Sequence, residues 1–240
     1  MKSVITLIRF IGAVLATLVF GIPTLLLRPF DRRGKIFHAF GRGWARVILW
    51  ICGIRVQVRG LDKIEPNGNY IYVSNHASLF DIPAVMAGIP DQVRIVYKQE
   101  LQKIPVFGWV LKYGPYVTIN RQKSFSAMRS LELAAERIKH GASVLLFAEG
   151  TRSEDGRLQP FKRGAFSLAA KTDKPIIPLT INGSYDRRPK GKFLINPGII
   201  ELVLEKPIPT DAGEGKKFEE SLMNRVSEAI RMHFKEPAAV

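Results

Sequence analysis

The chain has 240 residues, 46% of them hydrophobic, and a formal net charge of +15 at pH 7. A chain of this length can bury one sizeable core, so we expect one main domain. The single cysteine, Cys52, excludes an intramolecular disulfide framework and a cysteine-based metal cluster. Because Cys52 lies inside an apolar run, the sequence predicts a packing role for it rather than nucleophilic chemistry.

The positive charge is concentrated near the N-terminus, where residues 1–60 hold ten Lys and Arg residues against one acid, Asp31. Such a charge indicates nucleic acid, an anionic membrane or a phosphorylated substrate as the partner. The sequence has no helix-turn-helix, zinc-finger or RNA-recognition signature. Because the basic residues accompany long apolar stretches, membrane lipids are the favoured partner and nucleic acid is the weaker alternative.

Two apolar segments open the chain. The run from Phe10 to Leu27 has no charged residue, and as a helix it would be ~27 Å long, against ~30 Å for a bilayer core. The second run, from Trp44 to Ile54, is too short to span. The sequence therefore favours a membrane-associated helical hairpin over residues 1–54, dipped into the cytoplasmic leaflet with its basic turn at the headgroups. A single transmembrane pass is the alternative.

Downstream, strand patterns alternate with helix patterns. The predicted strands cover residues 54–59, 70–74, 92–97, 115–119, 142–147, 175–181 and 199–204. The predicted helices cover residues 80–88, 100–112, 125–140, 163–172 and 216–235. This alternation predicts an α/β fold over residues 55–240, with a largely parallel central sheet flanked by helices.

A first candidate site follows the predicted strand at 70–74. The sequence Asn75-His76-Ala77-Ser78-Leu79-Phe80-Asp81 leads into a helix start marked by an acidic residue and an early proline, Pro83. The spacing lets the Asp81 carboxylate fold back onto the His76 imidazole. A carboxylate bound to one ring nitrogen sets the tautomer and leaves the other nitrogen free to accept a proton. An ordinary loop histidine and a helix-capping aspartate would give the same spacing.

A second candidate site follows the predicted strand at 142–147. There the chain breaks into Glu149-Gly150-Thr151-Arg152 and a polar loop. A glycine, a hydroxyl group, an arginine and open backbone amides at the C-terminal end of a strand suit an anion, usually phosphate.

Together, the sequences NHASLFD and FAEGTR resemble the two hallmark motifs of the glycerolipid acyltransferases, in particular those that act on 1-acyl-sn-glycerol-3-phosphate. Asn120 stands where this family commonly has Asp, and Ala148 stands where it usually has Pro. The resemblance runs in order from about residue 55 to 205 and includes four further segments: Tyr97–Leu101, Ile104–Trp109, Gly114–Arg121 and Ile177–Leu179.

The resemblance implies transfer of an acyl chain from acyl-CoA or acyl-carrier protein to the sn-2 hydroxyl of lysophosphatidic acid, giving phosphatidic acid. It implies that His76 is the general base and that Asp81 orients it. The residues implied for the acceptor-phosphate site are Lys98, Arg121, Glu149, Gly150, Thr151 and Arg152, with Glu149 holding an arginine or the backbone turn.

Three alternatives stay open: glycerol-3-phosphate as acceptor, another lysolipid as acceptor, or a non-enzymatic binding protein. No cofactor is expected besides the thioester substrate. The sequence has no G-x-S-x-G elbow, dinucleotide fingerprint or P-loop. No metal is expected either, because His38, His140 and His233 have no ligand-like partners in the sequence.

Overall fold

The computed structural model describes the whole chain except residues 1, 66–67, 120–141, 173, 211–214 and 238–240. Seven strands form a single sheet in the order β1-β7-β6-β2-β5-β3-β4. The strands are β1 (Ile54–Arg59), β2 (Ile71–Ser74), β3 (Val93–Lys98), β4 (Val117–Ile119), β5 (Ser143–Phe147), β6 (Ile176–Asn182) and β7 (Gly198–Leu204).

Most neighbouring strands are parallel, and only β6 and β7 pair in antiparallel fashion. The α/β class with a largely parallel sheet is therefore confirmed. Each of the seven predicted strands is present, with ends that differ by at most two residues. Strand β6 is buried over its whole length because it lies inside the sheet with helices on both faces.

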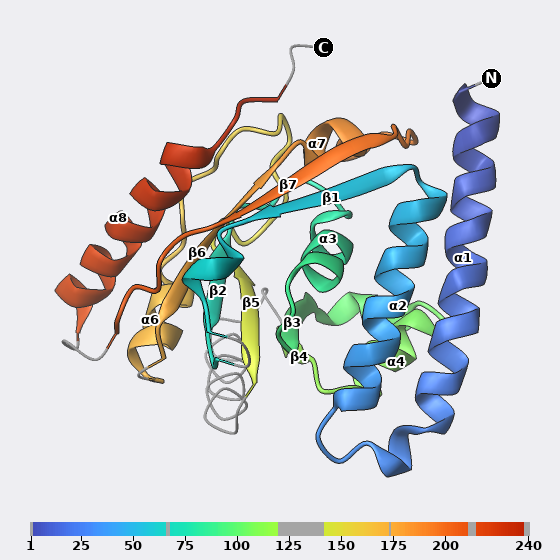
Figure 1. Cartoon of the computed structure of the whole chain (residues 1–240), viewed down its shortest axis with the longest axis horizontal. Helices are drawn as coiled ribbons and strands as arrows, with labels where there is room; N and C mark the ends of the chain where they lie inside the picture. Colours follow the sequence, from blue (N-terminus) through green and yellow to red (C-terminus); the bar gives the residue numbers. More distant parts are fainter. Residues whose placement is uncertain (1, 66–67, 120–141, 173, 211–214, 238–240) are drawn as a thin grey trace.

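Helices cover both faces of the sheet (Figure 1). One side carries α1 (Lys2–Leu26), α2 (Lys35–Ile51), α3 (Asp81–Gly88) and α4 (Phe107–Tyr113). The other side carries α6 (Gly164–Ala170) and α8 (Lys216–His233). The short helix α7 (Ser184–Arg187) connects β6 to β7 in the chain. The side chains of each strand alternate between two apolar cores, as the period of a strand requires. On β2, Tyr72 faces the core under α2 and α3, whereas Val73 faces the core under α6 and α8.

The predicted helix over 100–112 is wrong as one element. The chain forms a 3-10 helix, η3 (Gln99–Lys103), then an extended residue, Ile104, and only then α4. Pro105 explains the break, because proline disfavours a helical backbone at the residue before it and has no amide hydrogen to donate. The predicted helix over 125–140 lies outside the described residues.

The N-terminal segments form two helices side by side, as predicted, joined by a basic turn that contains the 3-10 helix η1 (Arg28–Phe30). Within the described part of the chain, one helical segment, Ser3–Leu26, is long and apolar enough to cross a membrane. Helix α2 is longer than expected and joins the main core through Ile48 and Leu49, as does the buried Cys52 that follows it. Burial raises the pKa of the Cys52 thiol to about 11, which fits the predicted packing role.

Candidate active site

The candidate residues gather at one edge of the sheet because three neighbouring parallel strands end there. His76 follows β2, Glu149 follows β5, and α7 with its basic continuation follows β6. Strand β2 lies between β5 and β6, with Ser74 in register with both Phe147 and Leu179. The carboxyl ends of adjacent parallel strands are the usual location of sites in open α/β sheets.

His76 and Asp81 form a close pair. The Nδ1 atom of His76 lies 2.6 Å from Oδ2 of Asp81, and Asp81 is fully buried as the first residue of α3. The same Oδ2 atom accepts hydrogen bonds from the backbone amides of Ala77 (2.8 Å) and Ser78 (2.9 Å). The carboxylate therefore holds both the imidazole and the turn between them. Because Nδ1 is occupied, Nε2 is the ring nitrogen available to a substrate.

Two further contacts hold the His76 turn against neighbouring strands. The side-chain amide of Asn75 donates to the carbonyl of Ile181 (2.9 Å) and accepts from its amide (2.8 Å), which ties β2 to β6. On the other side, the His76 ring stacks on the Phe147 ring, with centroids 3.8 Å apart and planes inclined by 13°. Asp81 at Nδ1 and Phe147 at the ring face thus restrain the imidazole, as a positioned proton acceptor requires.

Glu149 lies beneath this turn and is 2% exposed. Its Oε1 atom accepts the backbone amide of His76 at 3.3 Å, while Oε2 is buried without a hydrogen-bond partner. Burial raises the pKa of Glu149 to about 8, with a smaller contribution from the charge of Asp81. Glu149 was expected to hold either an arginine or the backbone turn, and this geometry supports its holding the turn.

Gly150 makes the turn that follows β5. Its φ is +74°, a backbone conformation that favours glycine, and its amide donates to the carbonyl of Phe147 (3.0 Å). Thr151 is exposed and Arg152 is partly exposed. The amide of Ser153 donates to the carbonyl of His76 at 2.8 Å. The loop that carries Arg152 is thereby fastened to the turn that carries His76.

The other two predicted site residues have different outcomes. Lys98 ends β3, at the same edge of the sheet, but it is half exposed and forms an ion pair with Glu100 at 3.1 Å. Arg121 lies outside the described residues.

The structure adds Arg188 and Lys190, which we did not select from the sequence. The carbonyl of Arg188 accepts a hydrogen bond from the Ser78 hydroxyl (3.0 Å), and Lys190 Nζ donates to the carbonyl of Arg152 (3.2 Å). Burial, and then the nearby charge of Arg152, lowers the pKa of Arg188. A signal was present in the sequence, because Arg187-Arg188-Pro189-Lys190 is a basic run just beyond a predicted strand.

An apolar cavity lies among the helices α1 to α4. Ile82 and Met86 of α3 line it from the side of Asp81, and Tyr97 lines it from the end of β3. Helices α1 and α2 contribute Phe20 and Trp44. Among the described residues, no group of three or more His, Cys, Asp or Glu side chains could hold a metal ion.

The fold and the site define an α/β protein with an oriented imidazole and a nearby arginine pair, and with an apolar cavity among its N-terminal helices. The Acyltransferase family model matches residues 55–182, and the chain belongs to this family. It is 36% identical over 194 residues to a chloroplastic 1-acyl-sn-glycerol-3-phosphate acyltransferase of Brassica napus, covering 80% of this chain and 55% of that protein. It is 32% identical over 213 residues to such an acyltransferase of Cocos nucifera, covering 87% of this chain and 68% of that one.

The structure of the 1-acyl-sn-glycerophosphate acyltransferase of Thermotoga maritima superposes on this chain with a TM-score of 0.83 at 28% identity. The match covers 96% of this chain and 93% of that one. The resemblance to the glycerolipid acyltransferases is confirmed. The chain spans only about half the length of the Brassica relative, 55%.

Proposed function

We propose that the protein transfers an acyl chain from a thioester to the sn-2 hydroxyl of 1-acyl-glycerol-3-phosphate, which gives phosphatidic acid. The observation that carries this proposal is the His76–Asp81 pair at 2.6 Å, held beside Arg152 and Arg188 at one sheet edge. The pair supplies a base for an alcohol, and the arginines supply a site for the phosphate of the same molecule. The names of the matched relatives agree with this acceptor.

The reaction needs a base because an alcohol is a poor nucleophile at neutral pH. In the proposed step, Nε2 of His76 takes the hydroxyl proton while the oxygen attacks the thioester carbonyl. The carbon–sulfur bond then breaks, and the leaving thiolate takes the proton from the imidazolium. Asp81 stabilises the imidazolium between these events. A thioester is already activated, so the step needs no covalent acyl-enzyme.

The acceptor phosphate would lie against Arg152 and Arg188, with Lys98, Arg121 and Thr151 as further candidates from the family resemblance. Arginine suits this role because its planar guanidinium can donate two parallel hydrogen bonds to a phosphate. A protonated Glu149 would add no negative charge beneath the phosphate, and its raised pKa favours this state. Gly150 would let the loop turn closely at this point.

We also propose that residues 1–54 attach the protein to the cytoplasmic face of a membrane, while residues 55–240 form the catalytic domain. Only 17% of the apolar stretch of α1 is buried. Near its start, Arg9 donates to the carbonyl of Ile195 (2.8 Å), and near its end Gly21 packs closely against Val106. Because α1 contacts the α/β domain near both ends, a bilayer-spanning α1 would pull that domain into the bilayer. A hairpin lying in one leaflet fits this contact better.

The test is an assay of the purified full-length protein with radiolabelled acyl-CoA or acyl-carrier protein. The acceptors are lysophosphatidic acid, glycerol-3-phosphate and lysophosphatidylcholine. The proposal expects transfer chiefly to lysophosphatidic acid, with loss of transfer in His76→Ala. His233→Ala is a matched control, since His233, the last residue of α8, has an acidic partner of its own, Glu205, at 2.7 Å. Transfer only to another acceptor, or none with either donor, would overturn the proposal.

A further inference from the structure

A second hollow lies at the opposite edge of the sheet from His76. Its rim includes Gly68 before β2, Arg94 near the start of β3 and Ser143 at the start of β5, together with the turn between α1 and α2. Its volume is about 1030 Å³. The five residues of β5 separate the two edges by roughly 16 Å at about 3.3 Å per residue. The hollow is therefore separate from the candidate active site.

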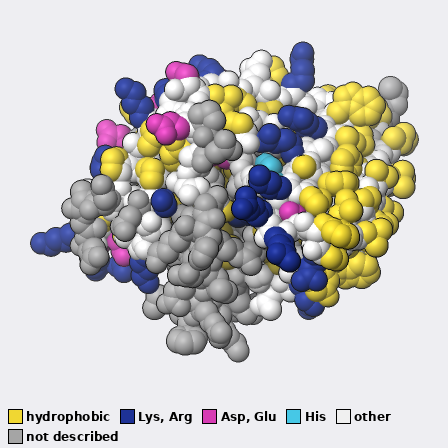
Figure 2. Space-filling model, turned by 60° about the horizontal axis from the view of Figure 1, so that its bottom comes forward, with side chains coloured by type: hydrophobic (Ala, Val, Ile, Leu, Met, Phe, Trp, Pro, Cys, Tyr) yellow, Lys and Arg dark blue, Asp and Glu magenta, His cyan; other side chains and the backbone are white. Residues whose placement is uncertain are grey.

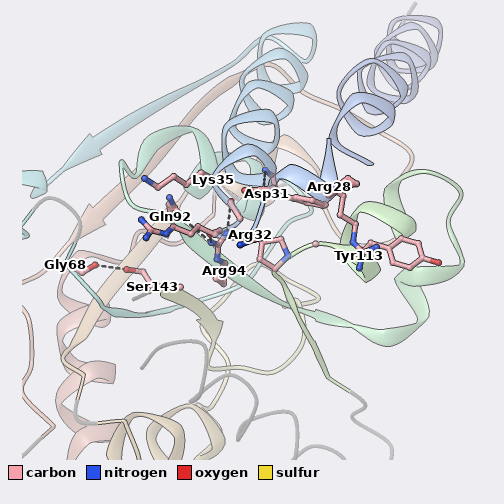
Figure 3. Close-up of a pocket in the computed structure, with 16 residues that line it drawn as sticks. Arg28, Asp31, Arg32, Lys35, Gly68, Gln92, Arg94, Tyr113 and Ser143 are labelled. Atoms are coloured by element: carbon pink, nitrogen blue, oxygen red, sulfur yellow. Dashed lines mark hydrogen bonds between the residues drawn. The ribbon is translucent and has the colours of Figure 1, made fainter. Parts of the chain in front are cut away.

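This hollow is strongly cationic. The basic side chains that line it are Arg28, Arg32, Arg33, Lys35 and Arg94, and among the described lining residues the only acid is Asp31. The Oδ2 atom of Asp31 accepts the backbone amide of Phe37 at 2.8 Å, so this carboxylate is engaged at the start of α2. Figure 3 shows Arg32, Lys35 and Arg94 around the hollow, with Arg28 beside Tyr113. The hollow thus presents an excess of positive charge to any ligand.

Arg94 holds the basic turn in place. It is 4% exposed and donates to the carbonyl groups of Arg33 (2.8 Å) and Gly34 (3.2 Å), and to Oε1 of Gln92 (2.9 Å). Gly34 has a φ of +69°, and a side chain there would collide with the Arg94 guanidinium. The turn is therefore a built part of the fold, and the exposed Arg32 and Lys35 project from a fixed backbone.

An apolar surface adjoins the cationic hollow. Leu26 and Phe30, on either side of Arg28, are 72% and 79% exposed, and they continue the exposed apolar face of α1. Arg28 lies over the ring of the half-exposed Tyr113, 5.2 Å from its centroid. Figure 2, which brings this edge forward, shows Lys and Arg side chains next to a broad apolar surface. A ligand with an anionic head and apolar chains would use both surfaces.

We propose that this hollow binds the phosphate headgroup of an anionic diacyl phospholipid, with the acyl chains along the apolar face near Leu26 and Phe30. The lipid would be held away from His76 as a membrane contact rather than as a substrate. Nucleic acid or free phosphate would use the charge but would gain nothing from the adjoining apolar surface. This inference does not depend on the acyl-transfer reaction.

The test is native mass spectrometry of the full-length protein in neutral detergent, titrated with phosphatidylglycerol or phosphatidylcholine. The test variant is the double substitution Arg32→Gln with Lys35→Gln, because both side chains are exposed and make no ion pair with a described residue. We expect it to weaken phosphatidylglycerol binding roughly tenfold or more, since charge near anionic lipid drives the contact. Phosphatidylcholine binding should be weak and unchanged.

Two controls make the outcome specific. Arg225→Gln with Arg231→Gln removes the same charge from the exposed surface of α8 and should leave lipid binding unchanged. Arg32→Lys with Lys35→Arg keeps the charge and should retain binding. Thermal unfolding confirms that each variant folds.

Three outcomes would overturn the proposal. One is equal phosphatidylglycerol binding by the test variant and the wild-type protein. Another is displacement of the lipid by inorganic phosphate at comparable concentration, which would indicate a simple phosphate site. The third is tighter binding of an RNA oligomer than of lipid, which would indicate a nucleic-acid surface. Failure of acyl transfer in the separate enzyme assay would leave this binding unaffected.

Discussion

The ring of His76 lies flat on the ring of Phe147, with centroids 3.8 Å apart. The two residues come from different motifs, and they meet because β2 and β5 are adjacent and in register. Phe147→Leu should lower kcat about 3- to 10-fold with little change in KM, because the imidazole loses a planar support. Phe147→Tyr keeps the stacked ring and should retain most activity. A normal kcat in Phe147→Leu would show that stacking does not position the base.

Substitution of the His76–Asp81 pair tests the base directly. His76→Ala should lower kcat about 10²–10⁴-fold, the usual contribution of a positioned base. Asp81→Asn should also lose most activity, because a neutral amide cannot stabilise the imidazolium that forms when His76 takes the proton. Asp81→Ala should in addition lower the melting temperature, since two backbone amides lose their acceptor. Near-normal turnover in a folded His76→Ala protein would contradict the base assignment.

Arg152→Ala and Arg188→Ala should each raise the KM for lysophosphatidic acid much more than the KM for the thioester. Each removes a charge-assisted contact to phosphate, which is worth about 1.5–3 kcal/mol, or roughly 10- to 100-fold. The same measurement on Arg121→Ala tests the predicted residue that lies outside the described structure. Arg225→Ala on α8 is the control for charge alone. Equal effects on both substrates would point to a structural role for the arginines.

The raised pKa of Glu149 predicts a pH dependence of stability. In the folded protein the carboxyl keeps its proton up to about pH 8, whereas in the unfolded chain it loses the proton near pH 4.5. Unfolding between these values releases a proton, so stability should fall as pH rises from about 4.5 to 8 and then level off.

Glu149→Gln removes this titration and can keep the acceptor for the His76 amide. The melting temperature of the variant minus that of the wild type should therefore be greater at pH 8 than at pH 5, by roughly 3 °C or more. Glu220→Gln, at an exposed position of α8, should show no such trend. A constant difference for Glu149→Gln would mean that Glu149 is ionised in the folded protein throughout this range.

Membrane topology can be measured by thiol labelling, because the single native cysteine, Cys52, is buried. Ser3→Cys places a thiol at the exposed start of α1, and Arg157→Cys places one in the exposed loop after β5, on the other side of α1 in the chain. If α1 lies in one leaflet, a membrane-impermeant maleimide should label both positions from the same side of sealed vesicles. Labelling from opposite sides would show that α1 spans and that the hairpin interpretation is wrong.

Much of the site could be predicted because its signals are local. The pairing of His76 with Asp81 needs only a short turn into a helix, and Asp81 is observed as the first residue of α3. Likewise, Gly150 marks a turn that its positive φ confirms. Arg188 was missed because nothing within a few residues of it indicates that β6 lies beside β2.

The sequence by itself determined the seven strands, the helical pair at the N-terminus and the two motifs, because alternation, apolar runs and turn residues act over a few positions. Only the tertiary structure decided which strands are neighbours, that β6 and β7 run antiparallel, and that the Arg28–Lys35 turn meets Arg94. These relationships depend on burying both faces of the sheet at once, and that requirement joins residues that are far apart in the chain.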